Sequence, residues 1–295
     1  MHSPMEMHTR TCVYKECRDG DAVSHIVKAG FFLRADDHKR VQRYLCRNCG
    51  RLFSAATKHD TFRQKKRRIN GLVRKLLCEK NSLNAIARIL RIHRKTVASR
   101  LDFFGRRARK YFDETKVINV SFVQFDEMQS SIHTKRKPVA IPMAVCGFTR
   151  RILALTVVSM PAQHPLINEA QLRDGPRADD RPAGVAYVLE RIKPMLTERP
   201  ILRSDSALHY PAAVARILPD AVHERVLSRR PIPHGNGELK EGFDPIFAFD
   251  HTAAMVRDCV SRLVRKTWGT SKRMDRLETH LLVYAHHHNL HRIPQ

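Results

Sequence analysis

Residues 118–129 read INVSFVQFDEMQ, an alternating pattern that becomes apolar and ends at two adjacent acidic residues. The alternation predicts a β-strand, because successive side chains of a strand point to opposite faces of a sheet. Two apolar segments follow, VAIPMAVCGF (139–148) and ILALTVVSM (152–160), and the GFTRR turn joins them as a hairpin. Neither is long enough to span a bilayer. We therefore expect three consecutive strands.

Helical and strand patterns alternate after this hairpin. They predict a helix over AYVLERIKPML (186–196), a strand over PILRSD (200–205), a helix over ALHYPAAVARIL (207–218), a short strand over AVHERVL (221–227) and a last helix over about 273–292. Another helix opens near Asp244–Pro245, since Pro is favoured in the first turn of a helix. This order fits an α/β fold of the ribonuclease-H-like type, a mixed sheet flanked by helices, over residues 116–295.

Two aspartates stand where predicted strands end. Asp126 ends the first strand and Asp205 ends the fourth. Neighbouring carboxylates at the ends of buried strands suit a hard divalent cation, because such ions prefer oxygen ligands. Each residue also has an ordinary alternative role: Asp126 could pair with a lysine, and Asp205 could cap the helix that follows.

The charge of the chain points to a polyanionic partner. Its 295 residues include 54 Lys+Arg and 29 Asp+Glu, a formal net charge of +25. Nucleic acid is the usual polyanion that neutralises such an excess. Residues 1–114 hold 28 basic and 11 acidic residues, so this third is the better candidate for first contact with phosphates. Ribosome association or a solvated basic surface is the alternative, and the 42% hydrophobic content argues against broad disorder.

Four of the seven cysteines form two pairs near the N-terminus, Cys12 and Cys17 in CVYKEC and Cys46 and Cys49 in CRNCG. The start, MHSPMEMHTR, has no apolar signal region, so we expect metal binding rather than disulfides. The second pair has the form of a zinc knuckle, in which backbone N–H groups point at the thiolates. We expect residues 1–60 to form a zinc ribbon that folds around structural Zn²⁺. Four unrelated thiols are the alternative.

A basic segment, RQKKRR (63–68), precedes the helical pattern SLNAIARILRIHRKTVASRLDFF (82–104). Ser82 is a suitable N-cap, and a break at Arg91–Ile92 separates two helices. This predicts a helix-turn-helix DNA-binding domain over 61–115, with GRRARK (105–110) as a linker or helix end. The second helix would expose the DNA-reading side chains of His93, Arg94, Lys95, Ser99 and Arg100. An ordinary helical hairpin with a charged face is the alternative.

Several of these motifs together resemble bacterial insertion-sequence transposases of the DDE class. The resemblance is carried by CRNCGRLFS (46–54), the helix-turn-helix, FDEMQ (125–129), the SD of RSDSALHY (203–210), and DPIFAFDHTAAMVRDCVSRLVRKTW (244–268). It covers nearly the whole chain. It implies a ribonuclease-H-like catalytic domain with Mg²⁺ (or Mn²⁺) ions and double-stranded DNA, both transposon ends and target, as substrate. The implied mechanism is in-line attack on a phosphodiester, first by water and then by the freed 3′ hydroxyl.

The resemblance also implies a third acid, and here the chain departs from the pattern. The family has a glutamate at the head of the basic helix, whereas Asp250 occupies the matching place in this sequence. Asp126, Asp205 and Asp250 would then hold the catalytic metals, with Glu238 in the glycine-rich loop as an alternative third acid. The basic residues of this tail would contact backbone phosphates; they are Arg257, Arg262, Arg265 and Lys266.

We therefore expect a DNA transposase that cleaves and transfers strands, located in the bacterial cytoplasm with the nucleoid and without membrane association. A homo-oligomer, a dimer in the simplest case, is expected because two transposon ends must be brought together. The main alternative is a catalytically decayed, transposase-derived DNA-binding protein, a repressor or an inert copy. A nuclease without strand transfer is a third. The run His286, His287 and His288 is expected at the surface or facing DNA, since consecutive helical residues point in different directions.

Overall fold

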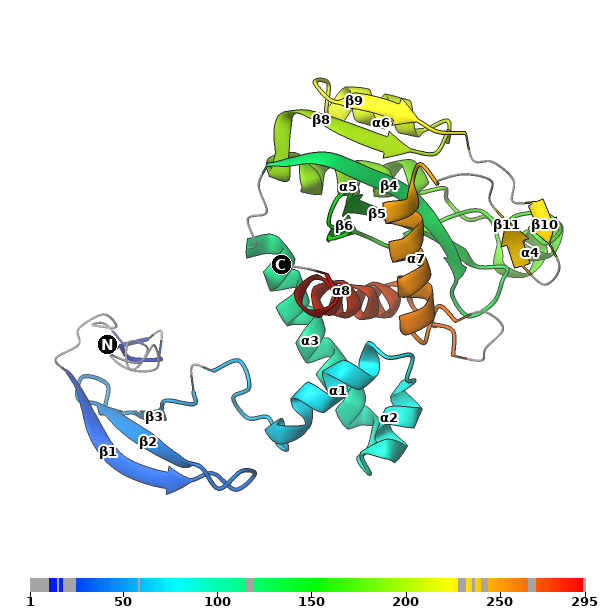
Figure 1. Cartoon of the computed structure of the whole chain (residues 1–295). Coiled ribbons are helices and arrows are strands. Elements are labelled where there is room, and N and C mark those ends of the chain that lie inside the picture. Colours follow the sequence, from blue (N-terminus) through cyan, green and yellow to red (C-terminus); the bar gives the residue numbers. More distant parts are fainter. Residues whose placement is uncertain are drawn as a thin grey trace. The chain divides into compact units, whose positions relative to one another are not determined.

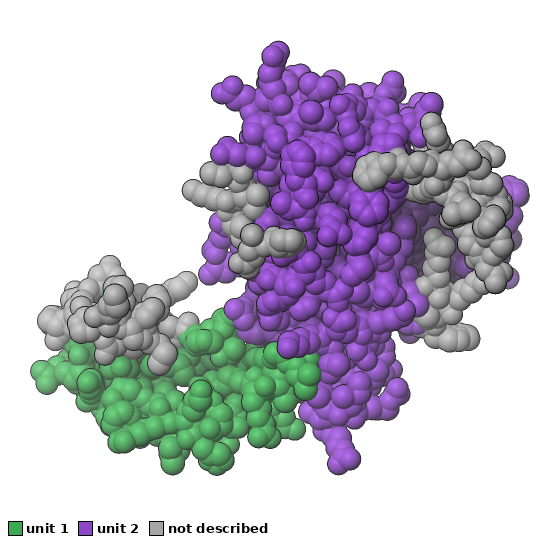
Figure 2. Space-filling view, in the orientation of Figure 1, with its two compact units in different colours: residues 1–72 green, residues 73–295 purple. Residues whose placement is uncertain are grey.

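The computed structural model describes residues 11–14, 16–17, 25–57, 59–114, 119–227, 232–234, 237–239, 244–264 and 269–293, with the backbone alone at 232–234 and 237–239. Arg265 and Lys266, two predicted phosphate contacts, lie outside these residues. The chain divides into two compact units, residues 1–72 and residues 73–295 (Figure 2).

The first unit contains a three-stranded antiparallel sheet. Its strands are β1 (Ile26–Leu33), β2 (Arg40–Cys46) and β3 (Leu52–Ser54), in that order across the sheet. A small cluster of buried residues, Cys17, Cys46 and Phe53, lies at its centre, and Tyr44 stacks on Phe53 with ring centroids 5.6 Å apart. Apolar burial on this scale contributes little stability, so the unit needs a further source of it.

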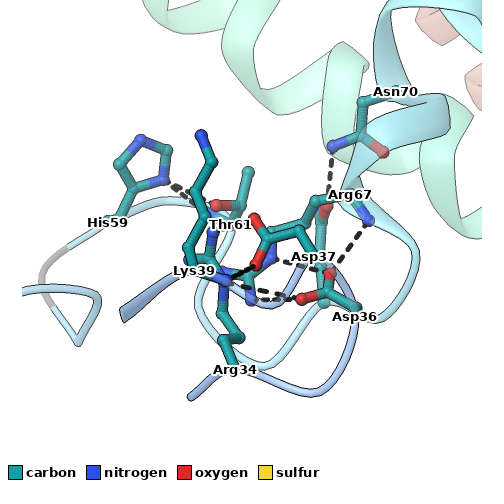
Figure 3. A network of polar contacts seen from close by, with 9 residues as sticks. Arg34, Asp36, Asp37, Lys39, His59, Thr61, Arg67 and Asn70 are labelled. Atoms are coloured by element: carbon teal, nitrogen blue, oxygen red, sulfur yellow. Dashed lines mark hydrogen bonds and ion pairs between the residues drawn. The ribbon is translucent and has the colours of Figure 1, made fainter. Parts of the chain in front are cut away.

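The basic segment 63–68 is tied to the loop between β1 and β2 (Figure 3). The Arg67 guanidinium donates to Asp36, with Nη2 3.1 Å from Oδ1, and its backbone N–H donates to Asp36 Oδ2. Arg34 Nε donates to Asp37 Oδ1 at 2.7 Å, and this arginine lowers the pKa of Asp37 to about 2. Arg67, at the start of the 3₁₀ helix η3 (Arg67–Ile69), is thus neutralised by protein.

A mixed six-stranded sheet forms the centre of the second unit. Its strands are β4 (Val120–Ser131), β5 (Pro138–Cys146), β6 (Ile152–Leu155), β7 (Val158–Ser159), β8 (Leu196–Ser204) and β9 (Val222–Arg225). The order is β6-β5-β4-β8-β9, and β7 pairs with β5. The pairs β4–β5, β5–β6 and β5–β7 are antiparallel, whereas β4–β8 and β8–β9 are parallel. The expected three hairpin strands and the order of the following strands are confirmed.

Helices flank this sheet on both sides (Figure 1). They are α5 (Arg181–Ile192), the 3₁₀ helix η4 (Lys193–Met195), α6 (Tyr210–Ile217), α7 (Phe247–Cys259) and α8 (Met274–His291). A further helix, α4 (Ile167–Asp174), is held to the loop between β4 and β5 by ion pairs of Arg136 with Glu169 and Asp174. Along β4, Val123 and Phe125 join the core made with α5 and α6, whereas Gln124 faces α7. This alternation confirms the α/β class, a mixed sheet with helices flanking it. A separate hairpin pairs β10 (Ile232–His234) with β11 (Gly237–Leu239).

Three further helices precede the sheet: α1 (Asn70–Leu77), α2 (Leu83–Ile89) and α3 (Arg94–Glu114). Ser82 caps α2 as expected, since its hydroxyl accepts the backbone N–H of Ala85 at 3.1 Å. Both α2 and α3 belong to the same compact unit as the sheet, and the division into three domains stays a prediction. Among the described residues, no helix combines the length and the apolar character needed to cross a bilayer.

Two expectations for the helical regions are wrong. The segment 105–110, predicted as a linker or helix end, is the interior of α3, where Gly105 permits close packing: a Cβ there would lie 2.4 Å from Thr279 Cγ2 of α8. His287 and His288, predicted at the surface, are buried in α8, and His288 Nε2 donates to Arg150 O at 3.0 Å. Long-range packing of α8 against neighbouring elements covers both positions, which helical spacing alone does not reveal.

Candidate functional site

The four paired cysteines lie together in the first unit. Cys12 Sγ is 3.7 Å from Cys49 Sγ, and Cys17 Sγ is 3.7 Å from Cys46 Sγ. All four sulfur atoms lie within 4.8 Å of one another. Four thiolates about 2.3 Å from one zinc ion, at the corners of a tetrahedron, are about 3.8 Å apart. The structure therefore confirms that these residues form one cluster that can bind a structural metal such as zinc.

The turn between Cys46 and Cys49 prepares the thiolate of Cys46. The backbone N–H of Cys49 lowers the pKa of Cys46 most, followed by the Cys49 side chain and the backbone N–H of Asn48, and together they bring it to about 7 against the opposing effect of burial. Gly50 takes a positive φ of 65° and donates its N–H to Cys46 O, which closes the turn. A cysteine binds metal as the thiolate, so this arrangement favours the ligating form. It is the knuckle geometry expected from Cys-x-x-Cys-Gly.

Asp126 lies within β4 at the centre of the second sheet and not at the end of the strand as predicted, because β4 continues to Ser131 in its pairing with β5. The parallel register pairs Gln124 with Arg203 of β8, so the end of β8 and the following Asp205 lie alongside Asp126. The pKa of Asp126 is raised to about 7, first by burial and then by the negative charge of Asp205, with a smaller contribution from Asp250. The three predicted acids are thus within electrostatic reach of one another.

The three carboxylates do not form a closed ligand set. Among the described residues, the only group of candidate ligand atoms that all lie within 4.8 Å is the four cysteines. Asp205 Oδ1 also accepts the backbone N–H of Ala207 at 3.1 Å, a bond within the turn that precedes α6, so Asp205 does not cap that helix, which begins at Tyr210. Carboxylate oxygens are ligands that Mg²⁺ prefers, but these three carboxylates are not grouped within 4.8 Å as the cysteines are.

Tyr210, which the sequence analysis did not identify, holds Asp126. Its hydroxyl donates to Asp126 Oδ1 at 3.0 Å, and the backbone N–H of Glu127 donates to the same oxygen at 2.6 Å. Tyr210 is 1% exposed and packs against Phe125, with ring centroids 5.0 Å apart. Two donors on the same oxygen, Oδ1, orient the Asp126 carboxylate.

Gln124 holds the helix turn that carries Asp250, and the sequence analysis did not identify this residue either. Its side chain is 4% exposed; Oε1 accepts the backbone N–H of Phe249 at 2.9 Å, and Nε2 donates to Pro245 O at 3.1 Å. These bonds attach the first turn of α7, which contains Asp250, to the strand that carries Asp126. The alternative third acid, Glu238, lies in β11, and its side chain is outside the described residues.

The predicted DNA-reading residues separate into two groups. His93, Arg94, Lys95 and Ser99 are exposed, and His93 Nδ1 accepts the backbone N–H of Lys95 at 3.1 Å at the start of α3. Arg100 is 5% exposed, so the expectation that its side chain is exposed is wrong. It lies three residues after the buried Val97 and thus on the covered face of α3. Spacing could have shown this.

The two described basic residues of the tail are only partly exposed. Arg257 lies in the last turn of α7, and Arg262 follows that helix, with its Nη1 2.9 Å from Ser271 Oγ. Both line one large groove of the second unit.

A search against known protein families finds none that matches the chain, and a search of curated proteins finds no similar sequence.

Proposed function

We propose that the protein is a DNA transposase that binds transposon ends and catalyses metal-dependent cleavage and transfer of DNA strands. The observation that carries this proposal is the half-buried Asp126, whose pKa is raised by burial and by the charges of Asp205 and Asp250. Like charges gathered in one place are costly unless a cation offsets them, and groups with raised pKa gather at functional sites. The strand order β6-β5-β4-β8-β9 supports a ribonuclease-H-like identity for this unit.

In the proposed mechanism, Asp126, Asp205 and Asp250 would hold Mg²⁺ or Mn²⁺ ions, which would supply activation of a water and charge stabilisation for phosphodiester cleavage. Tyr210 and the Glu127 N–H both donate to Asp126 Oδ1 and so fix the orientation of this carboxylate. Gln124 holds the start of α7, which carries Asp250, against β4. Cleavage also requires that the scissile phosphate be positioned, and basic side chains would do this.

The other parts of the chain fit roles in DNA recognition. We assign α2 and α3 to a helix-turn-helix, because the exposed Arg94, Lys95 and Ser99 lie together at the start of a long helix. The four-cysteine unit is assigned to a zinc ribbon. A dimer that joins two transposon ends, at the bacterial nucleoid, follows from the same proposal.

One observation favours the second candidate, a catalytically decayed DNA-binding protein. Asp250 is one methylene shorter than a glutamate, and the three carboxylates do not close into one ligand set. An open site is also compatible with an enzyme that gathers its ligands as the ions bind, so cleavage activity decides between the two.

The test uses the full chain with Mg²⁺ or Mn²⁺ and duplex DNA that carries the terminal inverted repeats of the element. We expect nicking by the wild type and none by Asp126→Asn or Asp205→Asn, with end binding retained. Asp258→Asn, an exposed acid on the same helix as Asp250, is the matched control and should nick normally. If wild type and variants bind the ends but are equally inert, the protein is the decayed DNA-binding protein.

A further inference from the structure

A cavity of about 490 Å³ lies in the second unit, where α2 and α3 meet the segment between α7 and α8. Five cationic side chains line it: Arg94, Arg262, Lys272, Arg273 and Arg276. Within the described part of the chain, no Asp or Glu lines it. We call these five residues the junction pocket.

Few of these charges are neutralised by the protein. Arg273 pairs with Asp275, and Arg276 pairs with Asp102. These two aspartates do not line the pocket. Arg94 and Lys272 form no ion pair within the described residues, and Arg262 donates to a neutral hydroxyl, Ser271 Oγ. Within the same described residues, three of the five cations therefore lack an anionic partner.

Arg262 is the most constrained of the five. Burial lowers its pKa, and the positive charges of Arg276 and Arg94 lower it further. A guanidinium remains charged in proteins, so this environment is unfavourable for Arg262 until an anion enters. Several arginines in one walled space are suited to a phosphate group, which accepts hydrogen bonds from guanidinium in paired geometry.

The surroundings of the junction pocket indicate an extended anion. Arg262 and Lys272 also line a larger groove of about 1080 Å³, which follows residues 128–131 at the end of β4 and includes Lys135. This is the strand that carries Asp126. A small ion would occupy only a fraction of a cavity of about 490 Å³, whereas a phosphodiester backbone can pass from α3 through the pocket into the groove.

We propose that the junction pocket binds a backbone phosphate of double-stranded DNA, on a path from α2 and α3 to the strand of Asp126. That the occupant is DNA rests on the proposed function. That the pocket takes a phosphate group rests on its cations and walls alone. Two measurements keep these two parts separate.

The first measurement compares the thermal stability of the full, zinc-loaded chain in inorganic phosphate and in chloride at equal ionic strength. A ligand that binds only the folded state raises Tm. We expect phosphate to raise Tm of the wild type, and Lys272→Gln and Arg262→Gln to lose at least half of that rise. Lys272 is exposed and unpaired within the described residues, so Lys272→Gln should fold normally even if Arg262→Gln does not. Arg216→Gln, an exposed arginine on α6, is the control and should keep the full rise.

The second measurement is the salt dependence of binding to the terminal-repeat duplex. Removing one cation that neutralises a phosphate should reduce the slope of log K against log salt by about 1. We expect that reduction in Lys272→Gln and no change in Arg216→Gln. An unchanged slope in Lys272→Gln overturns the DNA assignment, even if protection by phosphate is abolished. Absence of protection in the wild type overturns the phosphate site. A wild type that binds no duplex DNA refutes the proposed function, while the phosphate measurement still decides the pocket.

Discussion

The four cysteines and the three aspartates were both predicted to bind metal, but their ligand atoms are grouped differently in the structure. The cysteines come from two short segments, and their sulfur atoms already lie at the spacing of a tetrahedral site. The aspartates come from a central strand, from the end of its neighbour and from a helix. Their carboxylate oxygens are not grouped within 4.8 Å as the cysteine sulfurs are. Local turn chemistry can assemble thiolates, whereas repelling carboxylates on rigid elements need the cation itself to come together.

The largest effect should come from breaking the closed site. Cys46→Ser removes a ligand from the cluster, and we expect the first unit to lose its metal and unfold. Zinc binding contributes about 10–16 kcal/mol in zinc-finger peptides, far more than this small core. Metal analysis should give about one zinc per chain in the wild type and none in the variant. Cys78→Ala, at a buried cysteine outside the cluster, should retain zinc; loss of zinc there too would contradict the assignment.

The next largest effect is expected at the three aspartates, in the dependence of stability on pH. The pKa of Asp126 is about 7 when folded and about 3.9 when unfolded, so the folded state holds its proton more tightly. Without added Mg²⁺, the stabilisation that this one carboxyl contributes is complete below about pH 4 and is lost as pH rises through about 7, a change of about 2–4 kcal/mol. Urea unfolding of zinc-loaded protein at pH 5 and pH 8 measures the difference.

Asp126→Asn should remove much of that pH dependence, and Mg²⁺ at pH 8 should restore stability in the wild type alone. Glu127, whose pKa burial also raises to about 7, acts with the same sign, so some dependence should remain. Equal pH dependence in wild type and Asp126→Asn would contradict this account of the acids.

A smaller effect should follow from loosening α7. Gln124→Leu removes two hydrogen bonds, to Pro245 O and from the Phe249 N–H, although these groups keep Arg203 Nη1 and Ile246 O as other partners. The loss should cost about 1–2 kcal/mol in the free energy of unfolding. Binding of Mn²⁺ should weaken as well, because Asp250 follows Phe249. Gln129→Leu, at an exposed glutamine of the same strand, is the control and should change stability by less than about 0.5 kcal/mol. Unchanged Mn²⁺ affinity in Gln124→Leu would show that Asp250 does not contribute to metal binding.

The smallest effect is expected for Tyr210→Phe. The ring keeps its packing on Phe125, and only the hydrogen bond to Asp126 Oδ1 is removed, about 1 kcal/mol. Affinity for Mn²⁺ should fall several-fold while the melting curve changes little. Tyr187→Phe, at a half-exposed tyrosine of α5, is the matched control. Identical Mn²⁺ titrations of Tyr210→Phe and wild type would show that Asp126 needs no such support.

By itself, the sequence determined the features that depend on neighbours along the chain. The alternation in 118–129, the hairpin after it and the Ser82 cap are local patterns, and each leads directly to the observed element. The cysteine spacing is local in the same sense, because the Gly50 turn brings Cys46 and Cys49 together within one knuckle.

Tertiary structure alone decided which polar residues serve the sites. Arg100 and His288 are covered because α3 and α8 pack against other elements, although both are polar. Tyr210 and Gln124 acquire their roles only when α6 and α7 dock on β4 and bring a hydroxyl and an amide to particular oxygens and N–H groups. The closeness of Asp126, Asp205 and Asp250 has the same origin. It depends on sheet register and helix docking between residues far apart in the chain, which no local pattern records.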